Sequence, residues 1–268
     1  MTRASIPDRA KLADVASDAG VGSDSGAVAI HVTAPMSAVG SMSATVAIWE
    51  PWGLGHIHSA RLFASAAEDL ERQIAERGSP GDHFRVHRAN VTAAVFHAVA
   101  FLDALVSTVG VSIRDNRLYR PPDLSTSAIE RICTLSKETW DRLDRLPLLE
   151  RMQLLAQLTP AGQLDVGQNP YADTNLLMKI RNLLTHPDPE LVPVGEPHRL
   201  EKWCRGKFAP FQEGGNPWLP NGLLGAGLAR WSVTTVEAFA AEWCGRVGLV
   251  FDRCAATVST PAAEQSPD

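Results

Sequence analysis

The most regular hydrophobic pattern of the chain runs from Asn90 to Val109. Apolar residues recur there at spacings of three and four, which is the repeat of one face of an α-helix. The stripe consists of Val91, Val95, Ala98, Val99, Leu102, Leu105, Val106 and Val109. Its length and continuity predict the buried central helix of a helical domain.

An overlapping apolar stretch, from Thr92 to Ile113, approaches the length of a membrane span. Asp103 lies at its middle, and a charge at the centre of a bilayer costs about 3 kcal/mol on insertion scales. The sequence therefore favours a buried helix of a soluble protein, with no membrane partner. No apolar segment follows Arg3 and Arg9, so we expect no secretion signal and a cytoplasmic location.

Helical signals also lie on both sides of this segment. Ser59 is the expected N-cap of a helix from Ala60 to Arg77, which a glycine and a proline bring to an end. Residues 139 to 158 are expected to be helical with a break at Pro147. Residues 159 to 170 contain two prolines and two glycines, and they are expected to form a loop.

Asp173 is expected to open a further helix, from Thr174 to Thr185. Its apolar face comprises Leu176, Leu177, Ile180, Leu183 and Leu184. Pro187 disfavours helical geometry for the residue before it, so His186 is predicted to lie at the end of this helix.

No segment alternates apolar and polar residues over a useful length, and we therefore predict an all-α fold with few or no strands. Its expected parts are a flexible leader over residues 1 to 45, one helical domain over residues 46 to 256 and a disordered tail over residues 257 to 268. Within the domain we expect a central core (88 to 190), an irregular aromatic-rich extension (191 to 221) and a final helix (222 to 256).

The charge of the chain limits its possible partners. A net charge of -5 argues against a broad nucleic-acid-binding surface, which needs many lysines and arginines. Residues 88 to 186 escape the acidic bias, with 11 basic and 10 acidic side chains. A small RNA site there would depend on a few well-placed cations. The four cysteines form no C-x-x-C pair, which excludes a readable zinc ribbon or redox motif and predicts reduced, mostly buried thiols.

The segment that ends the predicted helix combines a cation, an amide and an imidazole, in Arg181, Asn182 and His186. Cleavage of RNA without a metal needs a base for the 2′-hydroxyl, an acid for the leaving oxygen and a cation for the phosphorane. Arg181 and His186 are five residues apart and would point about 140° away from each other on one helix, unless the helix ends between them. Asn182 and His186 share a face, so the amide could orient the ring or contact a phosphate.

The residues RNLLTH, from Arg181 to His186, resemble the R-x4-6-H motif of the HEPN superfamily, including the polar residue after the arginine. The segment FHAVAFLDALVSTV, from Phe96 to Val109, is similar to the early HEPN helix with its A-x-x-FLEA-like run. Leu135 to Asp173 resembles the usual order of a helical stretch and a variable loop before the motif helix. The resemblance covers about residues 88 to 190, with a final helix near residues 223 to 251 as a candidate addition.

The resemblance implies a HEPN-like helical bundle that dimerises through the motif helix, so that two arginines and two histidines line one cleft. It implies a metal-independent ribonuclease of a toxin–antitoxin, defence or RNA-processing setting, with an antitoxin or a defence-complex protein as a possible partner. In that reading His186 is the acid and base, Arg181 stabilises the phosphorane and Asn182 assists. No cofactor is implied. The alternatives are a non-catalytic module that binds RNA, nucleotide or protein, and a structural subunit of a defence complex.

Each candidate residue also has a purely structural interpretation. Arg181 would lay its stem along Leu177 and Leu184, and His186 would interact with the last carbonyls of the helix. Asp103 would be a polar residue at the edge of the core or a supporting partner of the dimer cleft.

Other patterns point to sites only weakly. His56, His58, His83 and His87 are possible metal ligands, but no cysteine or acidic residue sits at a supporting spacing, so we expect surface histidines and no metal. Gly225-Ala226-Gly227 is expected to be the turn that starts a helix. The tryptophans are expected to be core anchors, with base stacking as the alternative; they are Trp203, Trp218, Trp231 and Trp243.

Overall fold

A computed structural model of the chain describes residues 31–33, 45–47, 52–77, 83–114, 143, 145–157, 159–186, 196–212, 218–253 and 257–259. The chain divides into two compact units, Met1–Glu50 and Pro51–Asp268. The first unit contains two short antiparallel strands, β1 (His31–Thr33) and β2 (Thr45–Ala47), in which His31 is opposite Ala47. The leader predicted to be flexible therefore includes a strand, formed by residues that are rich in β-branched side chains.

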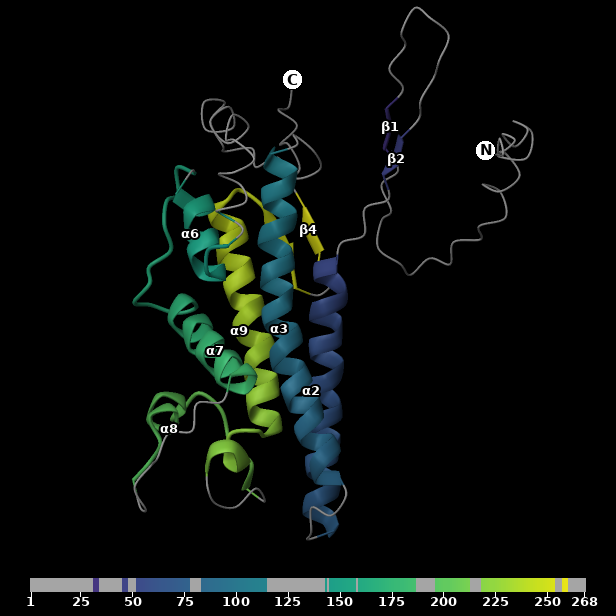
Figure 1. Ribbon diagram of the computed structural model, residues 1–268, viewed down its shortest axis with the longest axis vertical. Helices are drawn as coiled ribbons and strands as arrows, with labels where there is room; N and C mark the ends of the chain where they lie inside the picture. Colours follow the sequence, from purple (N-terminus) through teal and green to yellow (C-terminus); the bar gives the residue numbers. More distant parts are fainter. Residues whose placement is uncertain are drawn as a thin grey trace, which may run out of the picture. The chain divides into compact units, whose positions relative to one another are not determined.

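The second unit is almost entirely helical within the described residues, as the all-α prediction requires (Figure 1). Its helices are α2 (Trp52–Arg77), α3 (His83–Arg114), α6 (Leu148–Gln157), α7 (Tyr171–Thr185), α8 (Arg199–Cys204) and α9 (Ala226–Arg246), with one π-helical turn at Trp218–Gly222. Strands β3 (Val250–Asp252) and β4 (Thr257–Ser259) form a small antiparallel sheet.

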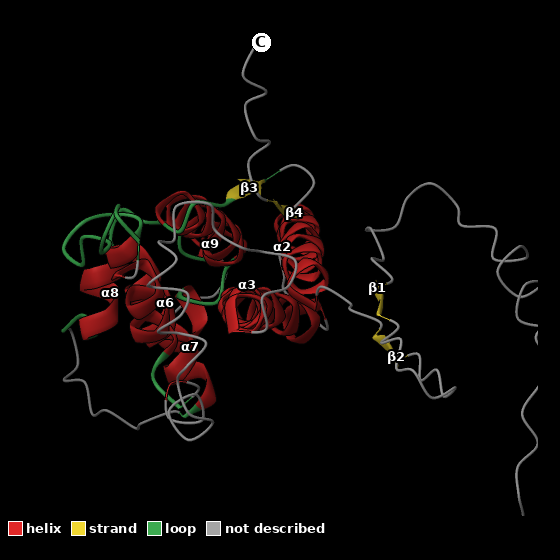
Figure 2. Ribbon diagram, turned by 90° about the horizontal axis from the view of Figure 1, so that it is seen from above, coloured by secondary structure: helices red, strands yellow, loops and turns green. Residues whose placement is uncertain are grey.

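Helix α3 lies at the centre of this unit. Helices α2, α3 and α9 run side by side, and α6, α7 and α8 lie on the side away from α2 (Figures 1 and 2). All eight residues of the predicted stripe between Val91 and Val109 are buried, which confirms the central buried helix. By length and composition alone, the segment His83–Val111 could cross a membrane, but just over half of this segment (56%) is buried by the rest of the chain.

The predicted starts of α2 and α7 are wrong. Helix α2 begins at Trp52 and not at Ala60, so Ser59 is an internal residue and not an N-cap. The physical reason is that Ile57 continues the buried face of Ala60 and Ala64 toward the N-terminus, and burial of that face outweighs the low helix propensity of nearby glycines. Helix α7 begins at Tyr171, three residues before the predicted Thr174.

The end of the final helix is also wrong. Helix α9 stops at Arg246, and Gly248 follows it with a φ of 74°, a conformation that glycine adopts without strain. Phe251, which was predicted to be helical, lies in β3 and is buried against the core. β3 pairs with β4, which falls in the segment predicted to be a disordered tail.

Helix α3 extends beyond the predicted Asn90 and Val109 at both ends, α9 begins at Ala226 and not at residue 222, and α8 lies within the extension predicted to be irregular. Other boundaries agree with the sequence. Helix α6 begins directly after Pro147, the predicted break. The described residues between Thr159 and Pro170 form turns, as predicted. Asp115, Asn116 and the Pro121-Pro122 pair also predict a loop from Arg114 to Ser125, and a helix is expected to follow it through Leu135. Both segments lie outside the described residues, apart from Arg114, the last residue of α3.

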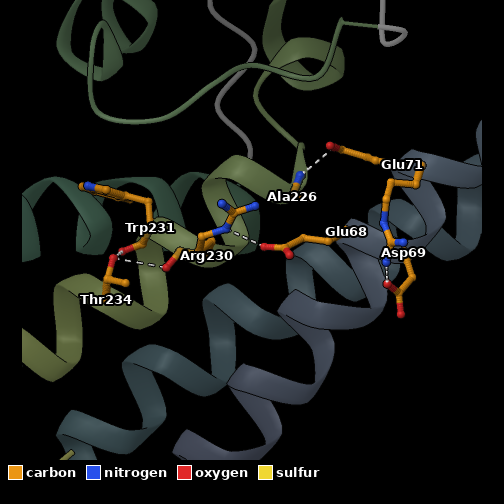
Figure 3. Close-up of polar contacts among 8 residues, drawn as sticks. Glu68, Asp69, Glu71, Ala226, Arg230, Trp231 and Thr234 are labelled. Atoms are coloured by element: carbon orange, nitrogen blue, oxygen red, sulfur yellow. Dashed lines mark hydrogen bonds and ion pairs between the residues drawn. The ribbon is translucent and has the colours of Figure 1, made fainter. Parts of the chain in front are cut away.

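Helices α2 and α9 are joined by a row of polar contacts. Arg61 forms an ion pair with Glu237 at 2.7 Å, and Arg230 forms one with Glu68 (Figure 3). At the N-terminus of α9, Oε1 of Glu71 accepts a hydrogen bond from the backbone N–H of Ala226 at 2.6 Å (Figure 3). This carboxylate therefore caps a helix whose own N-cap residue has no capping side chain.

The same carboxylate contacts a histidine in the core. Nε2 of His87 lies 3.0 Å from Oε1 of Glu71, and His87 is fully buried. The ring of Phe211 covers the imidazole with ring centroids 4.6 Å apart. Because a buried polar group without a partner costs about 1 to 3 kcal/mol, Glu71 stabilises the fold through two contacts at once.

We predict that Glu71→Ala lowers the free energy of unfolding by about 2 kcal/mol, because it removes a helix cap and leaves His87 without its partner. Urea unfolding followed by circular dichroism measures the change. Asp69→Ala is the matched control, since Asp69 lies on the same helix, is exposed and pairs only with Arg72 among the described residues. That variant should lose no more than about 0.5 kcal/mol. Equal effects of the two substitutions would contradict the prediction.

Candidate site at the end of helix α7

Helix α7 presents one face to the core and leaves the other to solvent. Thr174, Leu176, Leu177 and Ile180 are buried, and Leu183 and Leu184 pack against the core while half-buried. This confirms the predicted apolar face. At the start of the helix Asp173 forms an ion pair with Lys207 at 2.6 Å, which ties α7 to the segment after α8.

The helix ends where the sequence predicted. His186 is the C-cap residue, with φ −128° and ψ 76°, and its backbone N–H donates to the carbonyl oxygen of Asn182 at 2.8 Å. One residue earlier, Oγ1 of Thr185 donates to the carbonyl oxygen of Arg181 at 2.9 Å. His186 is exposed, so its imidazole is presented to solvent at the helix terminus.

Arg181 and Asn182 are brought into direct contact. Nη1 of Arg181 donates a hydrogen bond to Oδ1 of Asn182 at 3.0 Å, and the arginine is half-buried while the asparagine is exposed. The asparagine amide, which the sequence associated with the ring of His186, thus contacts the guanidinium through its oxygen. None of the hydrogen bonds between described residues involves the ring of His186. The three candidate residues therefore lie within one helical turn and its cap, with only the arginine and the asparagine side chains bonded together.

A cationic aromatic cluster lies beside this helix. Trp203 of α8 is 42% exposed, unlike Trp231 and Trp243, which are buried as predicted. Nζ of Lys179 lies 4.7 Å from its ring centroid, and the guanidinium carbon of Arg199 lies 5.2 Å from it. The expectation that Trp203 is a core anchor is therefore wrong, because α8 presents the ring at its surface.

Neither Lys179 nor Arg199 was a candidate residue from the sequence. Lys179 precedes Arg181 by two residues and was visible as part of the motif helix, but Arg199 is 20 residues farther along the chain. Their common neighbour, Trp203, could have been recognised only as an aromatic residue among charges, in the stretch RLEKWCR. The grouping depends on how α8 packs, which no local pattern specifies.

The four histidines considered as metal ligands do not come together. His83 contacts Arg77, His87 contacts Glu71 and His56 lies against His97. No group of three or more histidine, cysteine or acidic side chains suited to a metal ion occurs within the described residues.

The other secondary candidates have structural roles. Gly225 is the N-cap of α9, so the predicted helix-starting turn is confirmed. Asp103 is exposed on α3 and forms an ion pair with Arg151 of α6, which fits a polar residue at the edge of the core.

The thiols of Cys204 and Cys244 are poorly suited to react as nucleophiles. Burial raises the pKa of the Cys244 thiol to about 12. Burial also raises the pKa of Cys204 to about 11, against the opposing influence of the Lys207 charge. A thiol with so high a pKa holds very little thiolate near neutral pH, so neither residue is suited to act as a nucleophile. Cys133 and Cys254 lie outside the described residues.

The chain matches no protein-family model, no curated protein and no solved structure. The case for any function therefore depends on the residues of this chain and on their geometry.

We predict that Cys204 and Cys244 in the folded protein react with iodoacetamide at least about tenfold more slowly than in urea, because their raised pKa values suppress the thiolate. Labelling at about pH 8, followed by mass spectrometry of the peptides, measures each thiol separately. Equal labelling rates in the folded and unfolded chain would show that these thiols are accessible and ionised.

Proposed function

We propose that the protein is a metal-independent endoribonuclease of the HEPN type, with its site at the C-terminal end of α7. The observation that carries this proposal is the exposed His186, which lies at the end of the helix five residues beyond an arginine whose guanidinium is bonded to Asn182. An imidazole that leaves helical geometry is free to turn toward a substrate on the side of the arginine. Arg181 and His186 are the residue types that phosphodiester cleavage without a metal requires.

In the proposed reaction the imidazole of His186 removes the proton of a ribose 2′-hydroxyl. The 2′-oxygen then forms a bond to phosphorus, and the bond from phosphorus to the 5′-oxygen breaks. Arg181 balances the negative charge of the phosphorane, and the leaving 5′-oxygen takes a proton from a protonated imidazole. The products are a 2′,3′-cyclic phosphate and a 5′-hydroxyl, so atoms and protons balance without a cofactor.

A homodimer would complete this site. Two α7 ends that face each other would supply two histidines, one as the base and one as the acid, and two arginines around one phosphate. His186 is an exposed residue at the end of α7, which supports this arrangement. As part of the proposal, the enzyme acts in the cytoplasm as a toxin, a defence factor or an RNA-processing factor, with an antitoxin or defence-complex protein as a further partner.

We predict that His186→Ala lowers the rate of RNA cleavage at least about 100-fold, because it removes the proton-transfer group. The assay incubates the purified protein with labelled RNA in the presence of a chelator and reads the end groups of the fragments. His58→Ala is the matched control, since His58 is also exposed and lies on α2. Its cleavage rate should equal that of the parent, and both variants should keep the parent circular dichroism spectrum.

Cleavage at the parent rate by the His186→Ala protein would exclude the proposed mechanism. Cleavage that required a divalent metal would exclude it as well. An Arg181→Lys variant separates charge from shape, because lysine keeps the charge but cannot make the planar, two-pronged contact of arginine.

A second candidate function, RNA binding without turnover, is favoured by one specific observation. Trp203 combines an exposed indole with two cations, Lys179 and Arg199, beside the motif helix. Proteins that bind single-stranded nucleic acids combine base-stacking aromatic rings with cations that contact phosphates. In this alternative the same surface holds RNA, and His186 contacts the backbone without catalysing its cleavage.

We predict that Trp203→Ala weakens the binding of a short single-stranded RNA by about 5- to 100-fold, the range expected for the loss of one stacked base. Fluorescence anisotropy measures the dissociation constants, with the cleavage-deficient His186→Ala protein as the background. Trp203→Phe is the control, since it keeps an aromatic ring and should bind nearly as well as the parent. If the alanine variant binds RNA unchanged, Trp203 only packs α8 against α7.

A further inference from the structure

Two histidines from neighbouring helices meet on the surface between α2 and α3. Nδ1 of His56 lies 3.1 Å from Nδ1 of His97, and the ring centroids are 5.3 Å apart. The residues are 41 positions apart in the sequence, and both are half-buried. The pair is separate from the motif residues of α7, and it is a site that the proposed ribonuclease activity does not use.

The surroundings hold both rings in place. Phe63, two turns after His56 on α2, stacks on the ring of His97 with centroids 5.4 Å apart and an angle of 25° between the planes. Ile57 and Ala98, the sequence neighbours of the two histidines, are fully buried in the core. The backbones that carry the histidines are therefore anchored by packing, so the separation of the two nitrogens is set by the contact of the helices.

The distance between the nitrogens suits a shared metal ion. Two imidazole nitrogens at about 2.05 Å from one metal lie about 2.9 Å apart at a right angle and about 3.3 Å apart in a tetrahedron. The observed 3.1 Å lies between these values. We propose that His56 and His97 bind one divalent transition metal ion, of the copper(II), nickel(II) or zinc(II) class, through their two Nδ1 atoms. Imidazole is a preferred ligand of these metals.

The protonation of the pair is compatible with this role. Without a metal, one Nδ1–H donates to the other Nδ1. Metal binding requires the donor ring to carry its proton on Nε2 instead, which frees the second lone pair and releases no proton from a neutral pair.

Two protein ligands leave the remaining coordination positions open. Within the described residues no third histidine, cysteine or acidic side chain joins the pair, so water molecules would complete the coordination. A closed structural site has four protein ligands, whereas an open site of this kind can exchange its outer ligands. Bound metal would also join α2 to α3, and it would stabilise the folded chain because the unfolded chain does not hold the two rings together.

The test is a titration of the full chain with copper(II) in a non-coordinating buffer at about pH 7.5, above the ordinary pKa of a histidine side chain. We expect one copper ion per chain with an electron paramagnetic resonance spectrum that shows coupling to two imidazole nitrogens. His56→Ala and His97→Gln should each weaken copper binding at least about tenfold. Loss of a residue that only supports a metal ligand already lowers metal affinity by about 10- to 100-fold, and these variants remove a ligand itself. Copper should raise the melting temperature of the parent and not of these variants.

His58→Ala is the matched control, because His58 is exposed on the same helix two residues from His56. It should bind copper as tightly as the parent. Melting without metal establishes that every variant is folded. The proposal is overturned if His56→Ala and His97→Gln bind copper with parent affinity, or if His58→Ala loses as much affinity as they do. RNA cleavage in chelator does not depend on this metal site. A failure of the metal-site proposal can therefore be told apart from a failure of the ribonuclease proposal.

Discussion

The burial of α3 is the constraint on which the rest of the second unit depends. Its apolar stripe needs partners along its whole length, and α2, α9, α6 and α7 all pack against it. Hydrogen bonds then fix the surrounding helices to one another. Nε1 of Trp243 in α9 donates to the carbonyl oxygen of Met152 in α6 at 2.9 Å, and Oγ1 of Thr159 donates to the carbonyl oxygen of Arg246 at 2.7 Å. Because α7 packs against α3 and α9, the position of its C-terminal end follows from the packing of α3.

Much of this architecture could be predicted because the responsible signals are local. The spacing of three and four residues identified the buried face of α3, and Pro147 and Pro187 identified a helix start and a helix end. Wrong boundaries arose where tertiary burial overrode local propensity. Trp52 and the glycines after it have weak helical signals, but the burial of Ile57 extends α2 past them. Phe251 fits a helical repeat, yet the turn at Gly248 directs it into a strand.

The contacts between distant residues could not be predicted in the same way. His56 was considered together with His58, its neighbour in sequence, but the structure pairs it with His97 on another helix. His83 and His87 have the spacing of a metal site, but each contacts a different residue of α2, His83 with Arg77 and His87 with Glu71. A single sequence shows which residues share one face of a helix, but it does not show how neighbouring helices are rotated against each other.

The residues of the α7 site differ in kind from those that fix the fold. Leu177 and Ile180 are determined by packing, since each fills space in the core. At His186 the backbone N–H, and not the ring, closes the helix, so almost any residue could serve as this cap. Among the described contacts the packing of α7 places no demand on an imidazole there. The stem of Arg181 can be explained by the half-buried position of the side chain, but its charged group is bonded to an exposed Asn182. The packing of the fold therefore does not determine the chemistry of these side chains, and their identity is left to the function proposed for this end of α7.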